Sequence, residues 1–307
     1  MFMKEVKHIK IVKEMKVNDL VKEMSNSGVM QAGKLALAVD ILEEMIKDKE
    51  CKLFLGVAGA LVPGGMKQIL IDMLNEKWVD VLVITGANLT HDLGESLGYK
   101  HYQGSELMDD KDLRDKGYDR IYNSLMPNKI YIGLEKFIKE NFQDLSKCET
   151  IKDFLWTLGK LAPENTILHT CYKNKIPVFC PAISDSGIGL MIWGQISQGK
   201  KINVNAFEDL KEILDIAWTS KKAGVFYLGG GVPKNYIQQA MQLAPNKAIY
   251  GVQITTDTEH SGGSSGAPLK EGISWDKMNE KAKFVDLKLD VTVALPLITA
   301  SLKDRFK

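Results

Sequence analysis

The apolar residues of the chain follow two patterns in turn. Between residues 18 and 47 they recur at helical spacing, which predicts two helices broken around Ser25–Gly28. Further along they form short continuous runs, most of them closed by glycine or proline. Such runs, separated by helical stretches, are typical of buried parallel strands in βαβ units. The predicted strands are 53–59, 79–86, 176–181, 224–228, 248–255 and 284–289.

The predicted helices complete an α/β pattern. They cover residues 64–76, 92–97, 205–218, 233–243 and 294–302. Residues 92–147 are more polar and more mixed, which indicates an insertion or a cap over the sheet. No internal repeat or flexible linker interrupts the chain. The sequence therefore predicts an α/β fold with a doubly wound, Rossmann-like parallel sheet in one large domain, 1–307, with a helical N-terminal segment at about 1–50.

The amino-acid composition and charge limit the kinds of binding partner that we expect. Of the 307 residues, 45% are apolar and 26% charged, and 40 Lys and Arg oppose 39 Asp and Glu for a net charge of +1. This balance gives no electrostatic footprint for nucleic acid or for an anionic membrane. The sequence shows no apolar run of about 20 residues and no signal peptide. Four scattered cysteines, without metal-ligand spacing, favour reduced thiols. We expect a cytoplasmic protein without a metal.

Three glycine-rich loops follow predicted strands, where ligands of such sheets bind. They are Gly56–Gly65, Thr85–Asn88 and Gly229–Gly231. Small residues let the backbone approach a pyrophosphate, but tight packing turns need the same residues. None matches G-x-G-x-x-G, so both interpretations stay open. Asp290 follows the last predicted strand, where a carboxylate can bind ribose hydroxyls or simply cap a helix.

The densest polar cluster begins at Thr255 and continues past residue 272. A loop of about 17 residues inside a compact domain is usually functional or disordered. It leads into Trp275 and Lys277, an indole and an ammonium that can form part of a cation-binding wall. Lys277 is a candidate nucleophile if a water-poor pocket keeps its amine neutral. The alternative is a solvated lysine in the first turn of a helix. His260, beside Glu259, is a candidate base or an exposed loop residue.

At this loop the sequence resembles the deoxyhypusine synthase family, over residues 17 to 303. The resemblance is carried by several motifs in the family's order. They are Phe54-Leu55-Gly56, Val83-Ile84-Thr85-Gly86, Arg120-Ile121-Tyr122-Asn123, Pro127-Asn128, Pro181 to Ser186, Gly229 to Lys234, Thr255-Thr256, Ser265-Gly266, Glu271-x-x-Ser274-Trp275-x-Lys277 and Asp290.

The resemblance implies an NAD-dependent transferase. The family transfers the 4-aminobutyl group of spermidine to one lysine of a translation initiation factor 5A-type precursor, and 1,3-diaminopropane leaves. The lysine of the S-W-x-K motif, here Lys277, carries the aminobutyl group as an imine. The resemblance also implies a homotetramer with sites between subunits.

The same resemblance assigns roles to further residues. Trp275, Glu271, Asn235 and Asp185 are expected to bind the amine substrate. The residues expected to contact NAD are Gly59, Thr85, Asp185, Thr256, Gly262, Ser265 and Asp290.

Three positions depart from the pattern of many family members. Asn235 replaces a histidine that assists proton transfer, and an amide cannot take a proton at neutral pH. Leu190 and Ser264 stand where many members carry acids. Each loss removes charge complementarity to a cationic amine, worth about 1–3 kcal/mol.

These departures leave several functions open. The acceptor is either the protein lysine or a free diamine such as putrescine, which would give homospermidine. The donor is spermidine or another amine such as agmatine. A non-catalytic NAD- or polyamine-binding protein is the alternative outside enzymes, although a pure binder has no need of Lys277.

Overall fold

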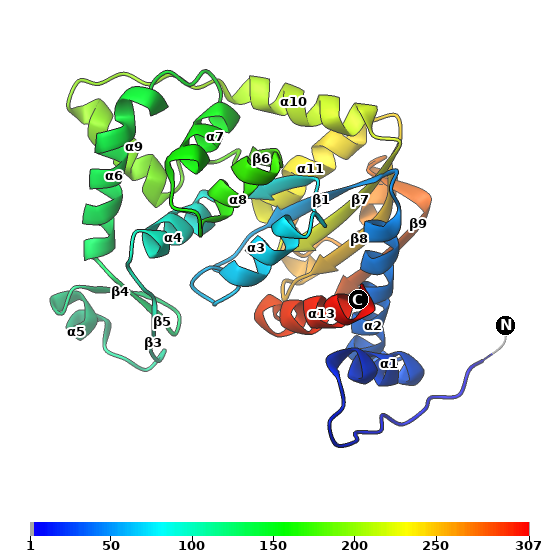
Figure 1. The fold of residues 1–307 in the computed structure, drawn as a ribbon. Helices are drawn as coiled ribbons and strands as arrows, with labels where there is room; N and C mark the ends of the chain where they lie inside the picture. Colours follow the sequence, from blue (N-terminus) through cyan, green and yellow to red (C-terminus); the bar gives the residue numbers. More distant parts are fainter. Residues whose placement is uncertain (1–2, 307) are drawn as a thin grey trace. The chain divides into compact units, whose positions relative to one another are not determined.

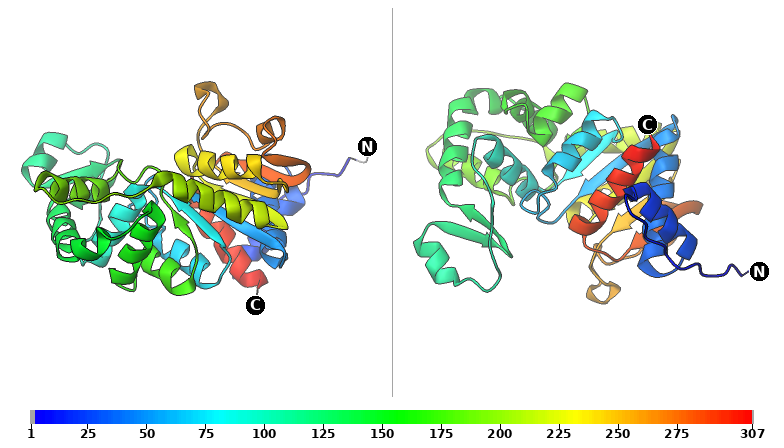
Figure 2. Two further views of the ribbon diagram at one scale, coloured as in Figure 1. Left: turned by 90° about the horizontal axis from the view of Figure 1, so that it is seen from above. Right: turned by 60° about the horizontal axis from the view of Figure 1, so that its bottom comes forward.

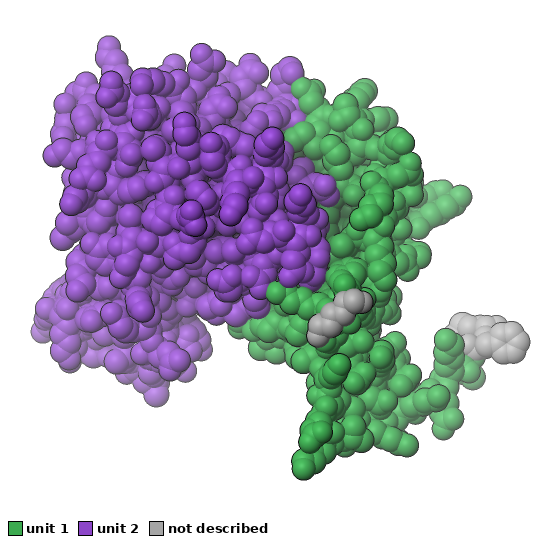
Figure 3. Space-filling model, viewed as in Figure 1, with its two compact units in different colours: residues 1–56, 213–307 green, residues 57–212 purple. Residues whose placement is uncertain are grey.

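The computed structural model describes residues 3–306, and its contacts divide the chain into two compact units (Figures 1 and 3). Unit 1 comprises residues 1–56 and 213–307, and unit 2 comprises residues 57–212. Helices alternate with parallel strands in the chain, which confirms the predicted α/β class. The single domain over 1–307 stays a prediction.

The strands of unit 1 lie in the order β1 (Cys51–Val57), β7 (Lys222–Leu228), β8 (Ala248–Ile254) and β9 (Met278–Leu287). β8 runs parallel to both β7 and β9. Six of the seven residues in each of β1 and β7 are buried, as their continuous apolar runs predict. Leu228 pairs with Ile254, and Ile254 pairs with Leu287. The carboxyl ends of these three strands therefore lie side by side.

Helices cover both faces of this sheet, which confirms the doubly wound arrangement. α2 (Met30–Lys47) packs against β8 and β9, and α13 (Val291–Arg305) packs against α2 and α1 (Val17–Ser27). α11 (Gly231–Leu243) covers the opposite face (Figures 1 and 2). The orange segment that follows β8 stands out beside α11 in the left view of Figure 2. It contains a short 3-10 helix, η1 (Glu259–Ser261), and leads to α12 (Glu271–Ser274).

Unit 2 contains one parallel strand pair and a small antiparallel sheet. In the pair, β2 (Val81–Ile84) aligns with β6 (Val178–Phe179). The antiparallel sheet has the order β3 (Tyr102–Gln103), β5 (Ser124–Pro127), β4 (Tyr118–Ile121) and lies within the polar stretch 92–147. The helices of unit 2 are α3 (Lys67–Asn75), α4 (Gly86–Ser96), α5 (Asp110–Asp115), α6 (Lys129–Leu145), α7 (Ile151–Leu161), α8 (Ile167–Asn174) and α9 (Gly187–Ser197), and α10 (Ala206–Thr219) contains the boundary with unit 1.

Several element boundaries differ from the prediction for identifiable reasons. α4 begins at Gly86 and not at residue 92, because the Thr85 hydroxyl caps it by accepting the Asn88 N–H. β9 begins six residues before the predicted strand at 284. It is the last strand in the sheet order, and only Met278 of its first seven residues is buried, so they form no apolar run.

Among residues 3–306, no helix is long and apolar enough to cross a bilayer. The four cysteines form no disulfide, and only Cys148 is not buried.

Candidate active site

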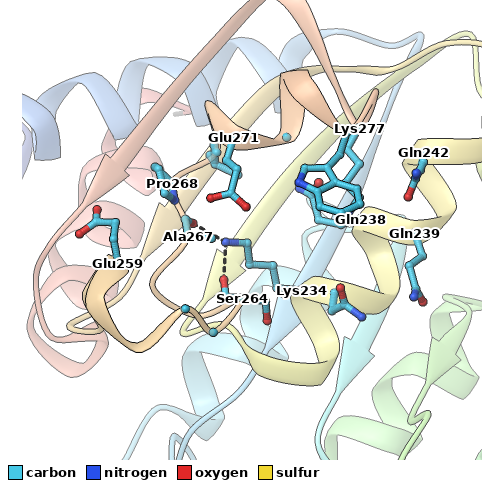
Figure 4. A pocket seen from close by; sticks show the side chains of 16 residues that line it. Lys234, Gln238, Gln239, Gln242, Glu259, Ser264, Ala267, Pro268, Glu271 and Lys277 are labelled. Carbon is cyan, nitrogen blue, oxygen red and sulfur yellow. Dashed lines mark hydrogen bonds between the residues drawn. The ribbon is translucent and has the colours of Figure 1, made fainter.

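Unit 1 holds a cavity of about 390 Å³ that follows one side of α11 (Figure 4). The α11 side chains that line it extend from Lys234 to Gln242, about 12 Å along the helix axis at 1.5 Å per residue. The segment from η1 to the start of β9 forms the rest of the wall. The lining residues are Lys234, Asn235, Gln238, Gln239, Gln242, Glu259, Gly262, Gly263, Ser264, Ala267, Pro268, Leu269, Glu271, Gly272, Trp275 and Lys277.

Lys277 and Trp275 lie together in this cavity. The Lys277 Nζ is 4.9 Å from the centroid of the Trp275 ring, a cation–π distance. Trp275 is 55% exposed, so a large part of its ring surface is available to a ligand. The structure thus brings together the indole and the ammonium that the sequence indicated as part of a candidate cation-binding wall.

A tight backbone turn sets the direction of Lys277. The Lys277 N–H donates to the Gly272 carbonyl at 2.8 Å, and the Asp276 N–H donates to the Ile273 carbonyl at 3.1 Å. Together with the left-handed Asp276, at φ 55°, these bonds form a Schellman motif at the end of α12. Lys277 therefore leaves a helix end and does not belong to a helical first turn, which corrects the solvated-helix interpretation.

Lys277 lies at the opposite edge of the sheet from the Gly229–Gly231 turn. The Ala248 N–H donates to the Lys277 carbonyl, and Ala248 pairs with Met278, so Lys277 lies at the amino ends of β8 and β9. The glycine-rich loops were expected to concentrate ligand chemistry at the carboxyl ends. The cavity instead runs with α11 from the carboxyl edge, near Gly231, toward the opposite edge.

Lys234 is a second lysine of this cavity, and its ammonium is buried. Its Nζ donates to the carbonyl oxygens of Ser264 and Ala267, both at 2.6 Å (Figure 4). Desolvation lowers the pKa of Lys234 to about 8, although the carboxylates of Asp286 and Glu271 oppose this shift. Lys234 thus fixes the loop that forms one wall of the cavity. In the sequence, Lys234 stood out only as the end of the glycine motif, and no role was expected for it.

Gln238 is another cavity residue to which the sequence patterns assigned no role. It is 6% exposed, and its Nε2 donates to the hydroxyl of the fully buried Tyr227 at 3.0 Å. Its Oε1 is buried and has no hydrogen-bond partner in the structure. The helical spacing i, i+4 of Lys234 and Gln238 could have indicated a polar stripe on α11, because it places both on one helix face.

The remaining predicted amine-binding residues fall in both units. Glu271 and Asn235 are exposed and line the cavity, and Ser264 lies in its wall with the hydroxyl 3.3 Å from the Gly231 carbonyl. Asp185 and Leu190 belong to unit 2. Leu190 is 56% exposed and lines a separate apolar cavity beside α9.

Of the predicted cofactor residues of unit 1, Ser265 lies against the turn at the start of α11. A Cβ on Gly230 would lie 2.3 Å from the Ser265 Cα, so only glycine permits this close contact between the triple-glycine turn and the loop. Ser265 also accepts the Gln253 Nε2–H at its carbonyl, at 2.8 Å. Thr256 is exposed. Gly262 has φ 65°, and no atom lies within 4 Å of the place of a Cβ.

Two of the predicted cofactor residues of unit 2, Gly59 and Thr85, are joined by Asn88, which is 1% exposed. Its Nδ2 donates to the Gly59 carbonyl at 2.8 Å and to the Thr85 hydroxyl at 2.9 Å. Its Oδ1 accepts the Val62 N–H at 3.1 Å. Asn88 therefore holds two of the predicted glycine-rich loops together. The sequence analysis noted Asn88 only as the end of a loop.

Asp185 and Asp290 both precede helices. Asp185 is exposed and precedes Ser186, the N-cap of α9, whose Cβ would lie 2.6 Å from a Cβ on Gly86. Asp185 is thus near the Thr85 turn of the same unit. Asp290 is the N-cap of α13, and its Oδ1 accepts the Thr292 N–H at 2.8 Å. The capping role considered for Asp290 is present in the structure. Within residues 3–306, no group of three or more His, Cys, Asp or Glu could hold a metal ion.

Comparisons with known proteins agree with this geometry. A family model described as deoxyhypusine synthase matches residues 19–302. "Probable deoxyhypusine synthase 1" of Methanosarcina mazei is 42% identical over 302 residues, covering 98% of this chain and 95% of the relative. A "Deoxyhypusine synthase-like protein" of Chlorobaculum tepidum is 36% identical over 319 residues, covering 97% and 89%.

A solved structure shows the same fold. It is a candidate deoxyhypusine synthase from Entamoeba histolytica, with a TM-score of 0.65 and 21% sequence identity over 94% of this chain and 93% of that one. Because the family model and the curated relatives match over nearly the whole sequence, the family is shown and not only the fold. The chain belongs to the deoxyhypusine synthase family.

Proposed function

We propose that the protein transfers the 4-aminobutyl group of spermidine to a lysine of a translation initiation factor 5A-type precursor, with NAD as cofactor. The observation that carries this proposal is the placement of Lys277 beside the Trp275 ring in a narrow cavity that follows α11. A cavity about 12 Å long in the direction of the helix suits a linear, extended amine. Membership of the family supports the same transfer.

Lys277 is the proposed covalent residue. Its neutral Nζ bonds to the oxidised carbon of the donor, the bond from that carbon to the departing 1,3-diaminopropane nitrogen breaks, and the aminobutyl group remains as an imine on Nζ. The acceptor lysine then replaces Nζ on this carbon and leaves Lys277 free. Trp275 binds the cationic chain through its ring face, and the Glu271 carboxylate pairs with a positively charged amino group.

Two groups of residues, one in each unit, suit contact with NAD. In unit 1, Gly231 and Gly262 have positive φ, and no atom lies within 4 Å of where their Cβ atoms would be. In unit 2 the same holds for Gly59, which Asn88 ties to Thr85. Such open backbone lets a pyrophosphate approach.

We therefore propose that Gly59, Thr85, Asp185, Thr256, Gly262, Ser265 and Asp290 hold NAD. When bound, NAD would accept the hydride removed from the donor carbon and would return it to the imine on the acceptor lysine, which gives the saturated aminobutyl amine.

The acceptor is tested by a two-acceptor competition read by mass spectrometry. The protein, NAD and spermidine are mixed with both putrescine and the translation factor precursor of the host. A mass gain on one precursor lysine supports the proposal. Homospermidine with an unmodified precursor overturns the acceptor assignment. If neither product forms, the same reaction with agmatine tests the donor, which the replacement of acids by Leu190 and Ser264 leaves less constrained.

We also propose that the protein is a cytoplasmic homotetramer. An exposed apolar face of α9 supports association, because Leu190, Trp193 and Ile196 are 56%, 66% and 46% exposed and line an apolar cavity. Analytical ultracentrifugation tests the assembly, and a monomer at micromolar concentration would contradict it.

A further inference from the structure

We infer that Gln238 determines which amines the cavity accepts, by receiving an N–H from a nitrogen in the interior of a linear aliphatic amine. This inference rests on the proposed function, because it takes the cavity to be an amine site. It adds a residue and a recognised chemical group that membership of the family does not provide.

The first observation is an unsatisfied acceptor. The Gln238 Oε1 is buried without a hydrogen-bond partner, and Gln238 lines the cavity with only 6% of its surface exposed. A buried amide oxygen that receives no hydrogen bond destabilises the structure, because the same oxygen would be hydrogen-bonded in water. An N–H of a bound amine would restore the missing hydrogen bond.

The second observation is that this oxygen lies near the base of Lys277. The place of a Cβ on Gly272 is 3.4 Å from the Gln238 Oε1 and 3.6 Å from the Lys277 Cβ. Because both atoms neighbour the same point, they are at most about 7 Å apart. Figure 4 shows Gln238 in the same part of the cavity as Lys277. A donor held at the Gln238 Oε1 would be close to the lysine that is proposed to bond to the adjacent carbon.

The third observation is the place of Gln238 along the cavity. On α11 it lies halfway between Lys234 and Gln242, the first and last helix residues of the wall. A linear amine that fills the cavity would therefore bring its interior, and not its terminal ammonium groups, to Gln238. A neutral amide oxygen at this point distinguishes a chain with an interior N–H from one with only CH₂ groups there, since the latter leaves the oxygen unpaired.

The orientation of the amide is fixed from behind. The Gln238 Nε2–H donates to the Tyr227 hydroxyl, which is fully buried in β7. This bond directs Oε1 into the cavity and makes Tyr227 a positioning residue. The Tyr227 ring in turn occupies the space above Gly56, where a Cβ would lie 2.9 Å from the Tyr227 Cδ1.

The test compares spermidine with 1,8-diaminooctane, which has the same chain length and carries CH₂ in place of the interior nitrogen. Isothermal titration calorimetry of the full-length protein, with reduced nicotinamide cofactor present to prevent turnover, gives the ratio of the two dissociation constants. We expect the wild-type protein to favour spermidine, and Gln238→Leu to reduce this ratio by about 10-fold to 150-fold, the range for a hydrogen bond to a charged group.

Three further variants separate recognition from folding. Gln238→Glu keeps an acceptor and should keep the preference for spermidine. Tyr227→Phe removes the orienting hydroxyl and should lower the ratio even if Gln238→Leu does not fold. The matched control is Gln195→Leu, which removes an equally buried glutamine on α9 of unit 2. It should leave the ratio unchanged.

The outcomes distinguish this inference from the proposed function. If borohydride traps an aminobutyl adduct on Lys277 but Gln238→Leu and Tyr227→Phe leave the ratio unchanged, the assignment of Gln238 is overturned and the proposed function stands. If the wild-type protein binds neither amine and forms no adduct, both are overturned. A ratio that falls in both variants and not in Gln195→Leu supports the inference.

Discussion

The Lys277 ammonium faces the Trp275 ring at 4.9 Å across a turn in which Asp276 alone separates them in sequence. One chain reversal thus provides both the proposed covalent residue and an aromatic surface for its cationic substrate. The contact between the two residues forms within one short turn. Substitutions can therefore test each residue separately.

Replacement of the covalent residue gives the first prediction. Lys277→Ala should lower transfer by ~10³-fold or more, because no other group of the chain is proposed to hold the aminobutyl intermediate. NAD binding, measured by fluorescence titration, should be retained. Lys270→Ala, an exposed lysine nearby, is the control and should leave transfer unchanged. Full activity of Lys277→Ala would remove the central assignment.

The aromatic surface gives the second prediction. Trp275→Leu should raise KM for the amine by about 3-fold to 30-fold, since a cation–π contact contributes about 0.5–2 kcal/mol. Trp275→Phe should lose less. The control is Trp218→Leu, in which an indole of similar exposure, 59% against 55%, is removed from α10 outside the cavity. Equal KM changes in the two leucine variants would argue against a specific role for Trp275.

The third prediction concerns the left-handed residue of the turn. Asp276→Gly should stay within about 1 kcal/mol of the wild-type free energy of unfolding, because relief of the left-handed backbone offsets the lost ion pair with Lys247. Asp276→Val should lose about 2 kcal/mol more, because a β-branched residue is strained at positive φ. Only the valine variant should also lose transfer activity. Denaturant unfolding and activity assays of the two variants measure both effects, and an inactive glycine variant would contradict the proposed role of the turn.

Burial of Lys234 gives a prediction of pH dependence. Its pKa is lowered from 10.5 to about 8, so between these values the unfolded chain holds a proton that the folded chain has released. The contribution of Lys234 to the free energy of unfolding should therefore rise from pH 8 to 10.5. Below pH 8 the folded chain bears the full free-energy cost of burying the Lys234 ammonium.

The comparison protein for this measurement is Lys234→Met. Both proteins are unfolded with denaturant from pH 7 to 10.5. The difference between their free energies of unfolding cancels the contribution of the titratable groups that they share. The difference in stability should grow with pH in favour of the wild type. Two parallel curves would show that Lys234 titrates at the same pH in the folded and unfolded chains.

The loop bridge of unit 2 gives the fifth prediction. Asn88→Ala should lower the free energy of unfolding by about 2–3 kcal/mol, because the Val62 N–H and the Gly59 carbonyl lose their partner in a buried place. It should also weaken NAD binding, since Gly59 and Thr85 are no longer held together. The control is Asn174→Ala, which removes an exposed amide contact to Asn75 in the same unit. Unchanged NAD affinity in Asn88→Ala would count against a cofactor role for these loops.

The sequence predicted the α/β class well because apolar runs such as those of β7 and β8 are buried on both faces. It predicted β9 poorly, because an edge strand with a polar face does not form such a run. The spacing of Trp275 and Lys277 allowed a cation-binding wall and also a solvated lysine, and the role of Lys277 followed from the family resemblance. Gln238 was missed because its importance comes from an unpaired oxygen, and hydrogen bonding to Tyr227 across eleven residues is invisible in a one-dimensional pattern.

The place of Lys277 at the amino ends of β8 and β9 could not be predicted from the sequence for the same kind of reason. Sequence order shows which residues precede a strand, but it does not show that α11 extends a cavity across the sheet. The long loop after β8 was predicted to carry chemistry and does line the cavity. Its attachment through the buried Lys234 could be seen only in three dimensions.

The missing side chain at Gly56 has a practical consequence for altering this protein. Any larger residue there would press on the Tyr227 ring, whose hydroxyl orients Gln238. A change in β1 that touches no ligand would then alter which amines are accepted. Searches for variants with new amine preferences should therefore vary Gly56 and Tyr227 together, since a smaller side chain at position 227 could make room for a larger one at position 56. The substrate range of this pocket is in that sense partly encoded in the packing of the sheet beneath it.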